Sequence, residues 1–63
     1  MGVRLMKYYQ YISETMGLEG KRLLAQDTRI PSVIAATAPD SEENLKRFKD
    51  AVRKITSKPP PEF

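Results

Sequence analysis

Apolar residues recur at helical spacing near the start of the chain. From residue 3 to residue 16 they fall on one side of a helix, at Leu5, Tyr8, Tyr9, Ile12 and Met16. Gly17 follows at the point where a helix commonly ends in a left-handed residue. The pattern therefore predicts a first helix over residues 3–16.

Two shorter helices are expected next, and glycine and proline set their limits. Leu23 and Leu24 form an apolar pair within residues 18–28, although Gly20 weakens the first turn, because a glycine inside a helix costs about 1 kcal/mol relative to alanine. Pro31 disfavours helical geometry in the residue before it and is itself suited to a first helical position. A break near residues 29–30 is expected, with helices over residues 18–28 and 31–38.

The last predicted helix, over residues 40–56, has the clearest pattern. Pro39 ends the preceding segment, and Asp40 with Glu43 fits the side-chain pair that satisfies the first free amide groups of a helix. Four apolar residues follow at helical spacing, and we call them the apolar stripe: Leu45, Phe48, Val52 and Ile55. A face this narrow is typical of a helix that packs along one partner helix.

Taken together, these patterns predict an all-α protein. We expect a small bundle of three to four helices within residues 1–57, followed by an extended, proline-rich tail over residues 58–63. Pro59, Pro60 and Pro61 cannot continue a helix and favour the polyproline II conformation. Because such a tail is stiff, it can place Phe63 in the groove of a partner at low cost in entropy.

The small size of the chain raises the question of what stabilises the fold. For 63 residues, folding is expected to bury on the order of 6,300 Å², whose apolar part contributes about 90 kcal/mol. Conformational entropy opposes folding by about 85 kcal/mol. The chain has neither Cys nor His, so a disulfide or a common zinc site cannot add to this small difference. We therefore expect association with another chain to contribute.

The same missing residue types narrow the possible functions. Without His or Cys the usual pairs of nucleophile and base cannot be assembled, and the Ser, Lys and carboxylate side chains show no recognisable catalytic spacing. The acidic residues between 40 and 43 fit a helix start better than a calcium loop, and Gly17 and Gly20 do not form a phosphate-binding motif. We expect no enzyme activity, no metal or other cofactor, and no small-molecule substrate.

Hydropathy and charge favour a cytoplasmic protein. An export signal needs a continuous apolar stretch, but Arg4 interrupts the apolar residues among positions 3–6 and Lys7 follows them, so no export signal is expected. The longest apolar run, residues 33–36, is far shorter than the roughly 20 residues that cross a membrane, and we expect no membrane partner. The net charge of +3 is compatible with nucleic acid or with an acidic partner, but bases and acids are interspersed.

Residues 23–48 have the order helix, turn, short helix and packing helix. The pattern is carried by Leu24, Ala25, Thr28, Ile30, Pro31, Ser32, Ile34, Pro39, Glu43, Leu45 and Phe48. This region resembles a lambda-repressor-type helix-turn-helix, which implies a DNA-binding regulator. The residues that could contact DNA are Lys21, Arg22, Arg29, Ser32 and Thr37. However, the expected recognition helix is short and offers Val33, Ile34 and alanines where Arg, Asn or Gln usually read bases.

We favour a different function, a small helical protein-binding module that acts as an accessory or adaptor subunit or as a homo-oligomer. Its partner would be another protein chain or a second copy of itself. The expected contact residues are the apolar stripe and two positions of the tail, namely Leu45, Phe48, Val52, Ile55, Pro60 and Phe63. DNA binding through residues 23–48 is the alternative.

Overall fold

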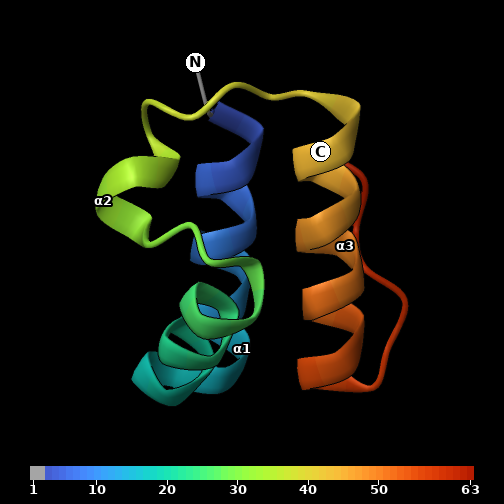
Figure 1. The fold of residues 1–63 in the computed structure, drawn as a ribbon. Coiled ribbons are helices and arrows are strands. Elements are labelled where there is room, and N and C mark those ends of the chain that lie inside the picture. The colour runs from blue at the N-terminus through green and yellow to red at the C-terminus, as the bar shows by residue number, and fades with distance from the viewer. Residues whose placement is uncertain (1–2) are drawn as a thin grey trace.

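The computed structural model describes residues 3–63 as three helices (Figure 1). Helix α1 spans Val3–Thr28, α2 spans Ser32–Ala35 and α3 spans Glu42–Thr56. No β-strand occurs in this part of the chain, so the prediction of a small all-helical protein is confirmed. Residues 1 and 2 of the predicted helical domain lie outside the described residues.

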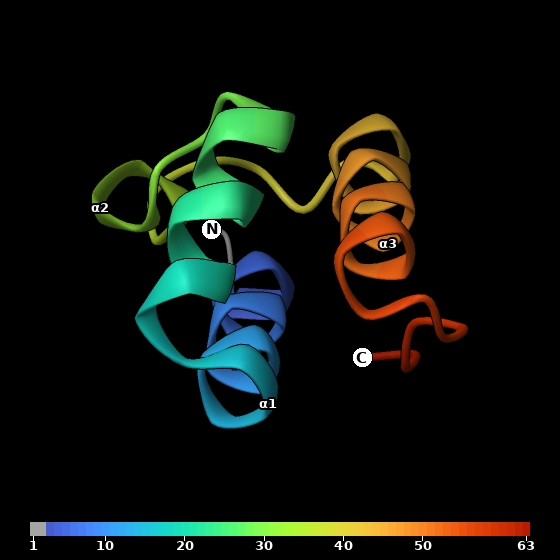
Figure 2. The same ribbon diagram turned by 90° about the horizontal axis from the view of Figure 1, so that it is seen from below.

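Helix α1 consists of two segments that meet at Gly17. This residue has φ 73° and ψ −159°, a combination open essentially to glycine. The expected positive φ at Gly17 is therefore present, and the two segments on either side of it correspond to the helices predicted over residues 3–16 and 18–28. The second segment turns back toward the first (Figure 2). The carbonyl of Ile30, just after it, accepts a hydrogen bond from the Tyr9 hydroxyl.

Gly20 is buried where the two segments of α1 approach each other. A Cβ atom at this position would lie 2.5 Å from the Cβ of Met16 and 3.2 Å from the carbonyl oxygen of Ile12. From helix propensity alone, Gly20 is expected only to weaken the helix. The structure shows that the missing side chain is what permits the close approach.

Helix α2 is shorter than the helix expected over residues 31–38. It ends at Ala35, and the following residues form a turn in which the Thr37 N–H donates to the carbonyl of Ile34 at 2.9 Å. The preceding break occurs at Arg29, which has φ 61°, a left-handed conformation that glycine usually occupies after a helix. The break thus occurs near residues 29–30, as Pro31 predicted, but the helix after it makes only a single turn.

The start of α3 differs by one position from the expected cap. Ser41, rather than Asp40, is the capping residue, and its hydroxyl accepts the N–H of Asn44 at 3.2 Å. The Asp40 carboxylate instead accepts the backbone N–H of Arg4 at 3.2 Å. Because Arg4 lies in the first turn of α1, the negative charge stands where the helix dipole favours it. Asp40 therefore ties the connection between α2 and α3 to the start of α1.

The core lies between α1 and α3, with α2 on the other side of α1 (Figure 1). Its fully buried apolar residues are Leu5, Tyr8, Ile12, Leu24, Ala35, Phe48, Ala51 and Val52. The exposed surface of 4283 Å² and the radius of gyration of 10.0 Å are close to the values of about 4,100 Å² and about 10.6 Å that a compact chain of this length has. The chain is therefore as compact as expected for a folded protein of this length.

Candidate protein-binding surfaces

The apolar stripe of α3 packs inside the chain itself. Phe48 and Val52 are fully buried, and the ring of Phe48 lies 5.7 Å from that of Tyr9 in an edge-to-face arrangement. Leu45 and Ile55, at the two ends of the stripe, are only partly buried. The helix that the stripe packs along is thus α1 of the same chain, and only its two ends remain open to a further partner.

The tail, residues 58–63, also contacts its own chain. After α3 the chain turns back and runs beside that helix toward α1 (Figures 1 and 2). The Tyr8 hydroxyl donates to the carbonyl of Pro61 at 2.8 Å, and the ring of Phe63 meets that of Tyr8 edge-on at 4.9 Å. The Glu62 carboxylate pairs with the Lys49 ammonium at 2.8 Å. We call Tyr8 and Lys49 together the tail seat.

The protonation states of the tail seat suit these contacts. Burial raises the pKa of Tyr8 above its ordinary value, although the nearby positive charge of Lys49 opposes that rise. The hydrogen bond to Glu62 raises the pKa of Lys49. At neutral pH the tyrosine is therefore a hydrogen-bond donor and the lysine a cation, as the carbonyl of Pro61 and the carboxylate of Glu62 require.

Pro60 and Phe63 of the tail, expected from the sequence to contact a partner, are thus packed against their own chain. Pro60 is partly buried, and Phe63 keeps 37% of its surface exposed. Next to Phe63 is a shallow hollow of about 370 Å³ that Lys7 and Tyr11 help to line. The contacts of Tyr8, Lys49 and Glu62 could not be predicted, because no local pattern shows that a helix and a tail so far apart in the sequence will meet.

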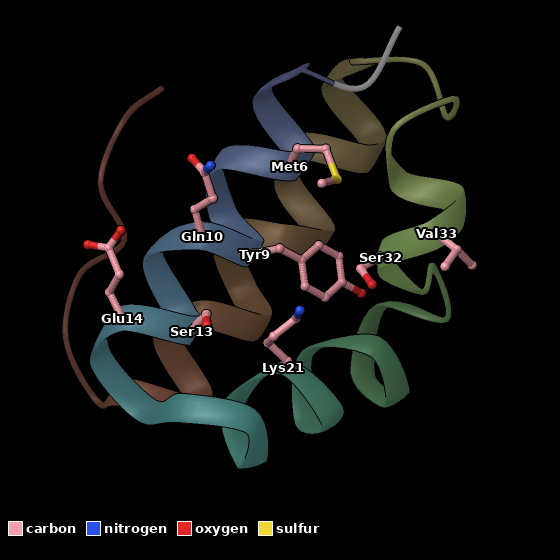
Figure 3. Close-up of a pocket in the computed structure, with 8 residues that line it drawn as sticks. All are labelled: Met6, Tyr9, Gln10, Ser13, Glu14, Lys21, Ser32 and Val33. Atoms are coloured by element: carbon pink, nitrogen blue, oxygen red, sulfur yellow. The ribbon is translucent and has the colours of Figure 1, made fainter.

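A groove of about 300 Å³ lies on the other side of α1, between its two segments and α2 (Figure 3). It is lined by Met6, Tyr9, Gln10, Ser13, Glu14, Lys21, Ser32 and Val33. Tyr9 is almost fully buried, and that burial raises the pKa of its hydroxyl. The side chain of Lys21 extends into the groove from the second segment of α1 (Figure 3). Among the ion pairs of the described residues, none involves Lys21.

The rim of this groove is apolar and exposed. Val33, on α2, keeps 82% of its surface in contact with solvent and points away from the groove floor (Figure 3). Ile34, next to it, is 51% exposed, whereas Ala35 is the one residue of α2 in the core. Helix α2 therefore contributes little to the core and presents most of its apolar surface to solvent.

The five candidate DNA contacts lie in different surroundings. Arg22 and Arg29 are exposed, and Lys21 and Ser32 face each other across the groove of Figure 3. The hydroxyl of Thr37 donates to the carbonyl of Ile34 at 3.0 Å, in the turn after α2. The structure thus brings Lys21 and Ser32 together, but as two walls of one groove.

Metal-ligating clusters and membrane-spanning helices are both absent from residues 3–63. There, no three side chains among His, Cys, Asp and Glu gather closely enough to hold a metal ion. None of the three helices combines the length and the apolar character needed to cross a membrane. Comparison with protein-family models, with curated proteins and with solved structures finds no match. The geometry of the surfaces is therefore the basis for any proposal about function.

Proposed function

We propose that the chain is a small protein-binding module without chemistry of its own, and that it binds its partner through the groove of Figure 3. The observation that carries this proposal is the exposed apolar side chain of Val33 on the rim of a groove into which Lys21 extends. Val33 belongs neither to the core nor to the partly buried residues packed against it, so its side chain adds little to the fold. Complete burial of a valine side chain by a partner would contribute about 1.5–3 kcal/mol to the free energy of binding.

The lining of the groove indicates the chemistry of the partner. Met6 and Val33 offer apolar contact, whereas Lys21 offers a positive charge to an acidic side chain. Glu14 lies at the edge opposite Val33, so an acidic group is expected near Lys21 and away from Glu14 (Figure 3). The net charge of +3 adds a weak long-range attraction for an acidic partner. We therefore infer that the partner is a protein segment with an apolar residue close to an acidic one.

Binding of DNA is the weaker proposal. A recognition helix needs several residues along its exposed face to reach base edges in the major groove. Helix α2 has four residues, and its most exposed side chains are the apolar Val33 and Ile34. The basic residues Arg22 and Arg29 are exposed and could contact DNA phosphates, so a binding test with duplex DNA at low salt is informative.

Site-specific photo-crosslinking in cells tests the groove as the binding surface. The full chain would carry a photoreactive phenylalanine analogue in place of Val33 or, as a control, in place of the exposed Lys46 on α3. We expect one discrete protein adduct from position 33 and none from position 46. The adduct should be lost on Lys21→Glu and kept on Lys21→Arg.

Three outcomes would overturn the proposal. Adducts of equal pattern from both positions would show that the groove is not a specific surface. An adduct that forms equally well with Lys21→Glu would contradict the inference that the partner places an acidic residue near Lys21. A salt-dependent shift with duplex DNA, together with no protein adduct, would favour the helix-turn-helix alternative.

A further inference from the structure

The tail seat recognises its segment through three contacts of different kinds. Tyr8 donates a hydrogen bond to the carbonyl of Pro61 and packs edge-to-face with the ring of Phe63, and Lys49 pairs with the carboxylate of Glu62. Proline-rich segments bind proteins in this manner, on aromatic side chains that also donate hydrogen bonds to backbone carbonyls. The seat therefore behaves as a peptide-binding site that already contains a ligand.

The connection between this ligand and the helix is short and strained. Ser57 is the single residue that caps α3 before the tail begins, and it has φ 60°, a left-handed conformation that non-glycine residues adopt at a cost. Its N–H donates to the carbonyl of Arg53 at 2.8 Å, which holds the turn in place. Relaxing φ at Ser57 would direct the tail away from its own seat.

We propose that a second copy of the chain can supply the tail, so that two chains exchange residues 58–63 and form a dimer. Each seat would then hold the same three contacts, made with the tail of the other copy. The sequence that fits the seat is known from the structure itself, and a second copy carries that sequence by definition. Exchange of an identical element is a low-cost way to form a dimer, because few contacts are lost.

The balance between the two forms depends on concentration and on Ser57. A short tether gives the chain's own tail an effective concentration on the order of 1 mM at the seat, which favours the monomer in dilute solution. The left-handed conformation at Ser57 disfavours the monomer, because in the proposed dimer the tail leaves that turn. For each chain, this shifts the equilibrium constant toward exchange by about fivefold or more. A residue that accepts or rejects a positive φ at position 57 should therefore shift the equilibrium.

A matched pair of full-length variants at position 57 tests the proposal. Glycine adopts positive φ freely, whereas a β-branched residue strongly resists it, and both keep the backbone N–H. In sedimentation velocity up to about 1 mM, we expect the dimer dissociation constant of Ser57→Val to be at least about tenfold lower than that of Ser57→Gly. Equal constants, or a Ser57→Val chain that stays monomeric throughout, would overturn the proposal.

Two further measurements exclude other kinds of dimer. Phe63→Ala, combined with Ser57→Val, should return the chain to the monomer, and a dimer that persists would not depend on the tail. In a mixed sample of isotopically labelled and unlabelled wild-type chain, contacts between the rings of Tyr8 and Phe63 should appear between different copies at high concentration. Their absence in a sample that is dimeric by sedimentation would also overturn the proposal.

The tail seat is a surface separate from the groove of the proposed function. Val33 and Lys21 lie on the α2 side of α1, whereas Tyr8 and Lys49 lie on the α3 side. Crosslinking from position 33 should therefore be unchanged by Phe63→Ala. Failure of tail exchange leaves the groove proposal intact, and the reverse holds equally.

Discussion

The two sides of α1 are covered to different degrees. On one side, α3 contributes three fully buried residues, Phe48, Ala51 and Val52, and the tail adds its contacts to Tyr8. On the other side, α2 contributes only Ala35 and leaves an open groove with an exposed Val33 at its rim. The contrast indicates that the α3 side contributes most of the buried core, while the α2 side leaves apolar surface exposed, which the proposed partner would cover.

The largest effect is expected on the α3 side. Phe48→Ala removes a fully buried ring that contacts both Tyr8 and Tyr9, and it should lower the free energy of unfolding by about 3–5 kcal/mol. Chemical denaturation followed by circular dichroism would measure it. Phe48→Leu, which retains most of the apolar volume, should cost clearly less. A loss below about 1 kcal/mol for the alanine variant would mean that α3 does not carry the core.

A smaller effect is expected where the two segments of α1 meet. Gly20→Ala places a Cβ 2.5 Å from that of Met16, and the repacking should cost about 1–3 kcal/mol despite the better helix propensity of alanine. The exposed neighbour Glu19 serves as a control, because Glu19→Ala adds no atom to a packed site. If Gly20→Ala unfolded at the same denaturant concentration as the control, the close approach at Gly20 would be unimportant.

The smallest effect on stability is expected at the rim of the groove. Val33→Asp changes a side chain that is 82% exposed, so the free energy of unfolding should stay within about 0.5 kcal/mol of the wild-type value. Partner binding, in contrast, should be lost, because the change replaces apolar contact by a charge. A large loss of stability would show that α2 supports the fold more than its burial suggests.

Signals that act over a few residues could be predicted from the sequence. The spacing of the apolar stripe predicted α3, and Gly17 predicted the break in α1. Pro31 predicted the start of α2 to within one residue. The length of α2 was overestimated, since Ala35 is its only buried residue and its apolar side chains gain little from continuing the helix. Propensity and periodicity alone cannot show how much burial a short helix will obtain.

Contacts between distant segments could not be predicted in the same way. The stripe indicated a partner helix, but it could not indicate that this helix is α1 of the same chain. Asp40 had the residue type of a helix cap, and the structure uses it at the start of α1, next to Arg4, while Ser41 caps α3. The tail seat depends on Tyr8 and Lys49 approaching residues 61–63, which no local pattern encodes.

The position of α3 late in the chain has a consequence for synthesis of the protein. The apolar face of the first segment of α1, which includes Leu5 and Tyr8, shares a core cluster with Phe48, Ala51 and Val52 of α3. During translation this contact cannot form until residues 48–52 have left the ribosome. The nascent chain therefore exposes this apolar surface before the residues that cover it are available, so contact with a chaperone during that interval should raise the yield of folded protein.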